Sequence, residues 1–141
     1  MQMPDVNALV YAHRGELPQH ERYRDWLSGL LNGLESYGVS DLVALGFQRV
    51  VTNPRIFRDP TPLAEALRFV DVFRNRPQAI PVAPGRRHWP IFRDLCQRIN
   101  ASGADVTDAY LAALAIEHGH DVVTEDKGFR RRFPGLRTTR P

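Results

Sequence analysis

The chain has very little cysteine and no long apolar run, and both absences limit what it can be. Cys96 is the only cysteine among 141 residues, so no disulfide can form within the chain. It occupies an apolar position of an expected helix, where we expect it to pack rather than react. No apolar stretch approaches the roughly 20 residues of a membrane span, and Asp5 interrupts any apolar leader almost at once. We therefore expect a cytoplasmic protein with no membrane partner.

The signatures of several common chemistries are also missing. The chain contains no glycine-rich phosphate loop, nucleophile elbow or dinucleotide fingerprint. His118 and His120 have no cysteine or histidine partners at zinc-like spacing, so we expect both at the surface near a helix end. No internal repeat or linker divides the chain. A length of 141 residues predicts one domain covering residues 1–141.

Lysine is nearly absent, whereas arginine is abundant. Lys127 is the only lysine among 19 basic residues, and the net charge is +3. The planar fork of arginine suits phosphates and bases, although the coding bias of a GC-rich genome is the simpler explanation of the overall count. The local run Phe129–Phe133 is more informative, because it interleaves three arginines with two aromatic residues just after Asp126. Such a cluster is suited to a polyanion.

Short apolar runs alternate with helical periodicity along the chain. Strands are expected at residues 1–5, 79–82, 121–124 and 136–138. Helices are expected at residues 6–13, from Pro18 in a region that Gly38 ends, at 42–51, after Thr61-Pro62, around residues 89–99, and from a Thr107 N-cap to Glu117. Strands separated by helices predict an α/β/α sandwich with a short, mostly parallel sheet of four or five strands.

Aspartates stand at three of the expected junctions between elements. Asp5 follows the first strand, Asp105 and Asp108 stand where a helix begins, and Asp126 follows a strand near the end. Each of them alone could be a helix cap or a turn residue. Carboxylates at several strand ends converge on one crevice of an α/β sheet, where they repel each other unless a hard cation neutralises them. The joint placement therefore favours metal-dependent phosphate chemistry.

Four segments in order resemble the PIN domain, and in particular the VapC-type toxins of bacterial toxin–antitoxin pairs. They are residues 5–12, 47–57, 105–113 and 123–129. The resemblance covers the whole chain and implies a PIN-like fold. It also implies an Mg²⁺- or Mn²⁺-dependent endoribonuclease that hydrolyses RNA phosphodiester bonds as the toxin of such a pair. Asp5, Asp108 and Asp126 would hold the metal ion. The candidate RNA contacts are Asn7, Arg49, Arg130 and Arg131.

One departure from the family pattern concerns a carboxylate. The family usually has a glutamate where this chain has Gly46. Asp41 is a poor substitute, because five positions along a helix turn about 140° from the same face. Asp105 is the candidate replacement, as a loop residue before the expected Thr107 cap, and a solvent-facing acid is an equally weighted alternative. The departure leaves the number of metal ions open.

Two alternative functions follow from this departure and from the composition. The first is a catalytically impaired PIN-like module that binds RNA or a protein partner without cutting. The second is an unrelated metal phosphohydrolase acting on small molecules. The apolar stripes predict a partner surface, because the expected helices offer more apolar area than a small sheet covers. Most of the stripe residues must form the core, and the groove left over would receive a cognate antitoxin or a second copy in a homodimer. The stripe residues are Tyr23, Leu27, Leu30, Leu31, Leu34, Leu45, Val70 and Phe73.

Overall fold

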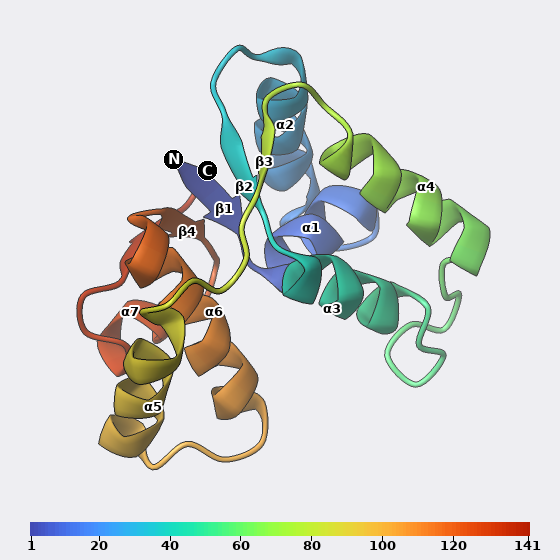
Figure 1. The fold of residues 1–141 in the computed structure, drawn as a ribbon. Coiled ribbons are helices and arrows are strands. Elements are labelled where there is room, and N and C mark those ends of the chain that lie inside the picture. Colours follow the sequence, from blue (N-terminus) through green and yellow to red (C-terminus); the bar gives the residue numbers. More distant parts are fainter.

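The computed structural model describes residues 1–141 and contains one sheet between two groups of helices (Figure 1). All neighbouring strands pair in parallel, in the order β3-β2-β1-β4-β5. The strands are β1 (Gln2–Pro4), β2 (Tyr37–Val39), β3 (Ala79–Pro81), β4 (Asp121–Val123) and β5 (Arg137–Thr139). The expected α/β fold with a short parallel sheet is therefore confirmed.

Helices connect the strands because parallel neighbours need crossover connections. They are α1 (Val6–His13), α2 (His20–Asn32), α3 (Asp41–Val51), α4 (Leu63–Arg74), α5 (His88–Ile99), α6 (Ala104–His118) and α7 (Phe129–Arg132). β2 and β3 are added in turn on one side of β1. The chain then crosses back over the sheet, and β4 and β5 are added on the other side of β1. Since crossovers are right-handed, α1–α4 cover one face and α5–α7 the other, as Figure 1 shows.

The strand order reverses between β1 and β4, and this topological switch point positions the site. Ligands of open α/β sheets bind outside the carboxyl ends of the strands at such a point. The register pairs Met3 with Val122 and Pro4 with Val123. The N–H of Asp5 extends the ladder by donating to the carbonyl oxygen of Val123 at 3.0 Å. Asp5 and the residues after β4 are therefore brought to the same edge.

The core lies on both faces of this sheet. Met3, Val122 and Val123 in the two central strands are fully buried, together with Phe47 on α3 and Leu114 on α6. Cys96 is partly buried and packs against this core, in agreement with the packing role expected for it. Every buried side-chain nitrogen or oxygen has a hydrogen-bond partner. None of the helices has the length and apolar character needed to cross a membrane.

The structure corrects several expected boundaries. Residues 37–39 form a strand that the sequence reading missed, because Gly38 suggested only the end of a helical region. A Cβ at Gly38 would lie 3.0 Å from Val82 and 3.1 Å from the Met3 Cβ, so glycine permits the strand to pack there. The expected Thr107 cap is wrong: α6 begins at Ala104, after Gly103 at φ 55°, and Thr107 is helical. The four-residue helix α7 was also missed.

Candidate active site

Asp5 is the most deeply placed carboxylate of the site. It caps α1, and its Oδ1 accepts from the Ala8 N–H at 2.7 Å, while only 8% of the residue is exposed. Burial raises the pKa of Asp5 from 3.8 to about 6, and repulsion from Asp108 and Asp126 adds to this rise. The Thr124 hydroxyl and the Ala8 N–H lower the pKa again, but by less. Asp5 is therefore both a helix cap and a site carboxylate.

Asp108 and Asp126 line the same pocket as Asp5. The pocket has a volume of about 130 Å³, and its apolar wall includes Leu111 and Phe129. Asp108 reaches it from α6, and burial raises the pKa of this carboxyl. Asp126 follows β4 in a tight turn, in which its Oδ1 accepts from the Gly128 N–H at 2.8 Å. Three segments distant in sequence thus supply the carboxylates of one pocket.

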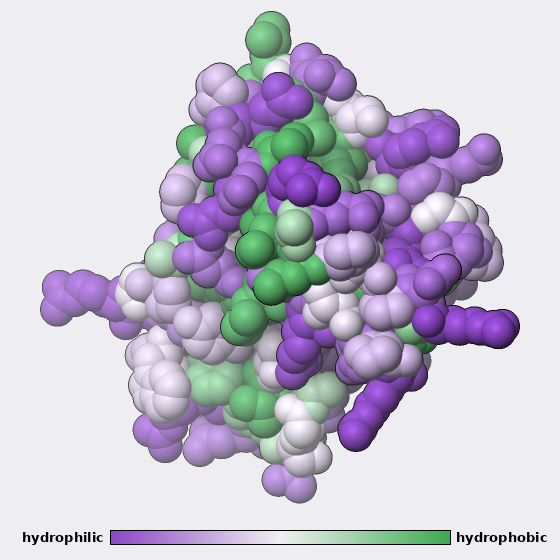
Figure 2. Space-filling view, turned by 90° about the vertical axis from the view of Figure 1, so that its right-hand side faces the viewer, coloured by the Kyte–Doolittle hydropathy of each residue, from purple (hydrophilic) through white to green (hydrophobic).

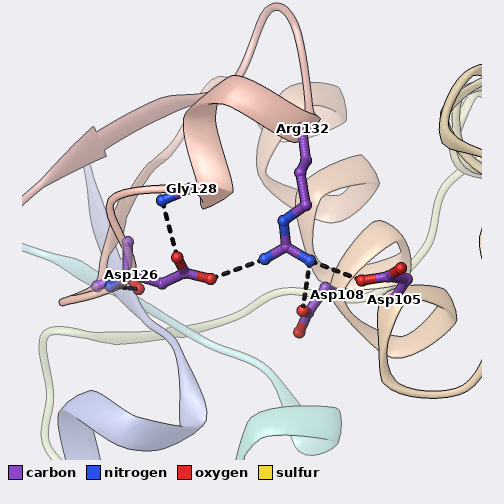
Figure 3. Close-up of polar contacts among 6 residues, drawn as sticks. Asp105, Asp108, Asp126, Gly128 and Arg132 are labelled. Atoms are coloured by element: carbon purple, nitrogen blue, oxygen red, sulfur yellow. Dashed lines mark hydrogen bonds and ion pairs between the residues drawn. The ribbon is translucent and has the colours of Figure 1, made fainter.

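Arg132 lies between these carboxylates, and the sequence reading did not identify it as a site residue. Its guanidinium donates to Asp105 at 2.8 Å, to Asp108 at 3.2 Å and to Asp126 at 2.7 Å (Figure 3). It packs over the ring of the buried Phe129, with its Cζ 5.5 Å from the ring centroid. Arg132 stands one helical turn after the apolar Phe129, and this spacing could have indicated that it lies on the same face as Phe129. The two neighbouring arginines, Arg130 and Arg131, made it hard to single out.

The chemistry of these donors fits a divalent cation. Carboxylate oxygens are the ligands that Mg²⁺ and Mn²⁺ prefer, and the raised pKa values of Asp5 and Asp108 reflect crowding and burial that a cation would offset. As the side chains lie, no three acidic, histidine or cysteine residues are close enough to hold one metal ion. In this structure the Arg132 guanidinium supplies the positive charge that balances Asp105, Asp108 and Asp126.

The structure assigns different places to the acids considered for the missing glutamate. Asp105 lies in the first turn of α6 rather than in a loop, so that part of the prediction was wrong. It pairs with Arg132 but does not line the pocket, and 43% of its side chain is exposed. Asp41 is an exposed partner of Arg74 and contributes nothing to the cluster. Asp105 therefore joins the cluster only through the shared guanidinium.

Gly46 has a packing reason. A Cβ at this position would lie 2.6 Å from Cγ2 of Val6, because α1 and α3 approach each other closely there. Valine is branched at Cβ and cannot easily turn away. A glutamate at position 46 would therefore require Val6 to move before its carboxylate could reach the site. Gly46→Glu by itself is therefore not expected to restore a metal ligand.

The four candidate RNA contacts fall in different surroundings. Asn7 is exposed on the wall of the acidic pocket. Arg49 is exposed on α3 and lines a larger groove next to that pocket. Arg130 lines a polar cleft on the other side of Asp126. Arg131 is exposed and lines none of these three hollows.

Comparison with known proteins shows the family to which the chain belongs. The PIN domain family model matches residues 3–132, and the chain belongs to the PIN-domain family. It is 45% identical to Ribonuclease VapC43 of Mycobacterium tuberculosis over 97% of this chain and 92% of that protein. It is 42% identical to Ribonuclease VapC25 of the same species, over 97% of this chain and 96% of that protein.

Solved structures share the fold at low sequence identity. VapBC2 from Rickettsia felis, crystallised with a DNA fragment from its promoter, contains a chain that superposes with a TM-score of 0.70 at 20% identity, covering 99% of this chain and 97% of that one. A chain of FitAcB from Neisseria gonorrhoeae superposes with a TM-score of 0.64 at 16% identity, covering 98% of this chain and 96% of that one. These likenesses establish the arrangement of helices and strands, and the resemblance to the PIN domain is confirmed.

The contact between Gly46 and Val6 predicts an unusual effect of alanine. Gly46→Ala should lower the free energy of unfolding by about 1 kcal/mol, because overpacking outweighs the gain in helix propensity. Gly29→Ala in α2 is the matched control, since no atom lies within 4 Å of its Cβ position, and it should raise stability by up to about 1 kcal/mol. Urea unfolding measures both. Equal stabilisation by the two substitutions would contradict the packing argument.

The raised pKa of Asp5 predicts a pH-dependent stability difference between the metal-free wild type and Asp5→Asn. Because the folded pKa of about 6 lies above the ordinary value of 3.8, the stability linked to this group is present at low pH and is lost as the pH rises through 6. The shift corresponds to about 3 kcal/mol. Asparagine keeps an oxygen for the Ala8 N–H. The free energy of unfolding of the mutant should therefore rise relative to that of the wild type between pH 4 and 7.

Denaturant unfolding in EDTA at several pH values measures this difference. The comparison of the two proteins cancels the other carboxylates, which titrate in both. A difference that stays constant with pH, or a mutant that is less stable at pH 7, would show that Asp5 serves mainly as a helix cap.

Proposed function

We propose that this protein is a divalent-metal-dependent endoribonuclease that acts in the cytoplasm as the toxin of a toxin–antitoxin pair. The observation that carries the proposal is the convergence of Asp5, Asp108 and Asp126 on one pocket at the switch point of a PIN fold. Relatives with 42% and 45% identity over nearly the whole chain are named ribonucleases, which supports the same reaction here.

In this mechanism Asp5, Asp108 and Asp126 would hold Mg²⁺ or Mn²⁺. Such a cation, when bound, polarises the scissile phosphate and lowers the pKa of the attacking water. The Ala8 N–H and the Thr124 hydroxyl keep Asp5 oriented towards the pocket.

Arg132 has a second task in the proposal. Its donors are shared among three carboxylates in the metal-free protein. Asp108 and Asp126 are also two of the three residues that would hold the cation, and their ion pairs with Arg132 would weaken in the loaded protein, because like charges repel. The released fork would then be free to donate to a phosphate oxygen of the RNA, the geometry to which arginine is suited.

This mechanism predicts that Asp5→Asn and Asp108→Asn each reduce RNA cleavage by at least about 100-fold, because each removes a negative charge that would hold the catalytic cation. EDTA should abolish cleavage by the wild type, and added Mg²⁺ or Mn²⁺ should restore it. Gel analysis of end-labelled structured RNA measures the rate. Arg93→Gln is the control, since Arg93 is exposed on α5 and forms no ion pair.

The same assay separates the alternatives. Full activity in EDTA or in Asp108→Asn would rule out the proposed mechanism. Wild-type protein that binds RNA without cutting it would be a catalytically impaired module. Hydrolysis of a generic phosphate ester without RNA cleavage would indicate a phosphohydrolase of small molecules.

The proposed antitoxin partner has a surface to bind. A groove of about 560 Å³ adjoins the acidic pocket and shares Asp108 with it. Exposed leucines lie in it or beside it on α3 and α4: Leu45 is 64% exposed, Leu63 60% and Leu67 42%. Figure 2 looks onto this side of the molecule and shows a band of apolar side chains between polar margins. An amphipathic segment is suited to such a groove.

Of the residues in the predicted apolar stripes, Leu45 lies in this groove, and most of the others belong to the core. Leu30 and Leu31 on α2 are partly buried against the core, and Val70 and Phe73 on α4 are buried. The exposed positions are instead on the side of α3 and α4 that lies beside the carboxylates. VapBC2 and FitAcB, the solved relatives, supply the analogy for a bound partner. A second copy of this chain is the alternative occupant in the proposal.

Leu45→Glu should weaken binding of the partner encoded by the neighbouring gene by at least about 10-fold, because it places a charge in an apolar contact. Leu34→Glu is the matched control. Leu34 is fully exposed, and it precedes β2, so it lies towards the amino ends of the strands, whereas the site lies at their carboxyl ends. Calorimetric titration measures both affinities, and light scattering detects a homodimer. Equal affinities for the two variants would place the partner elsewhere.

A further inference from the structure

A second, wholly polar cleft lies on the other side of Asp126 from the acidic pocket. Its volume is about 280 Å³, and no hydrophobic side chain lines it. Asp126 belongs to both hollows, so the cleft opens next to the proposed site of cleavage. We name it the basic cleft, and its lining residues are Thr124, Asp126, Lys127, Arg130, Thr138, Thr139 and Arg140.

The fold builds this cleft from the ends of two parallel strands, β4 and β5, and from the connection between them, which contains α7. The register pairs Val123 with Thr139, and the Thr124 N–H donates to the Thr139 carbonyl oxygen at 3.1 Å. The ends of β4 and β5 therefore stand together. Phe129 is buried and anchors α7, so that the exposed Arg130 beside it remains at the surface of the cleft.

The charge of the cleft is not balanced from within. Lys127 and Arg130 form no hydrogen bond and no ion pair, whereas Arg132 already engages the one carboxylate of the cleft, Asp126. Arg140 has only a long contact to Glu125, at 3.4 Å. Other arginines on this side of the molecule are neutralised more closely, such as Arg22 by Glu125 at 2.8 Å. Three cations therefore face a cleft in which no free anion is present.

We propose that the basic cleft binds a backbone phosphate of the RNA strand, at a nucleotide flanking the scissile bond. Unpaired ammonium and guanidinium groups supply the charge, and the threonine hydroxyls can donate to phosphate oxygens. Because Asp126 lines both hollows, a strand held in the basic cleft would lie next to the acidic pocket. This inference rests on the proposed nuclease function and adds to it the groups that position the substrate without reading its sequence.

Binding can be measured separately from cleavage. A fluorescein-labelled single-stranded RNA decamer is titrated with the Asp108→Asn protein in EDTA, at several KCl concentrations, and followed by fluorescence anisotropy. Lys127→Gln and Arg130→Gln, made in this background, should each weaken binding about 5-fold. Each should also reduce the slope of log K against log salt by about 0.7, the value for one phosphate contact on a single strand.

Two matched variants control for charge and position. Arg130→Lys keeps the charge and should keep the salt slope, although it loses the planar fork. Arg93→Gln removes the same charge from an exposed site on α5 and should change neither quantity. Inorganic phosphate at constant ionic strength should displace the RNA only weakly. Displacement at low millimolar phosphate would instead identify a site for the free anion.

The outcomes distinguish this inference from the nuclease proposal. If Lys127→Gln and Arg130→Gln match the Arg93→Gln control, or the background protein binds no RNA, the basic cleft is not a phosphate site. Metal-dependent cleavage by the wild type would then leave the nuclease assignment intact. If the salt slopes change as expected but the wild type cleaves no RNA, the cleft stands and the nuclease proposal fails.

Discussion

The parallel pairing of β1 with β4 is the constraint on which the rest of the structure depends. It brings together two segments that lie more than 100 residues apart and continues past the strands through the bond from the Asp5 N–H to the Val123 carbonyl oxygen. The strand order reverses at this pair, although all strands stay parallel. The connections on the two sides of the pair therefore lead to helices on opposite faces, and a crevice is left between them. Asp5, Asp126 and Asp108 reach that crevice from three different elements.

The charges around this crevice have a definite arrangement. Acidic groups occupy the pocket, and Arg132 bridges two of them, Asp108 and Asp126, to Asp105. Unpaired cations lie just beyond Asp126. The burial that raises the pKa of Asp5 works against stability at neutral pH, as is common where a site is built for function. A metal ion and an RNA strand would each meet groups of the opposite charge.

The missing family glutamate illustrates how packing and chemistry compete for one position. Gly46 permits α1 to approach α3, with Val6 occupying the space that a side chain would need. Asp105 does not replace the glutamate in the pocket, because it lies in the first turn of α6 and reaches the cluster only through Arg132. The acidic pocket therefore has three carboxylates, supplied by Asp5, Asp108 and Asp126.

The sequence by itself determined the features that depend on local pattern. The alternation of strands and helices, the parallel sheet and the aspartates at element junctions could be read from it, because periodicity and strand ends are properties of neighbouring residues. Only the tertiary structure decided the strand at Gly38, the role of Arg132 and the exposed side of α3 and α4. Each of these depends on side chains from distant segments, whose approach is set by packing across the sheet.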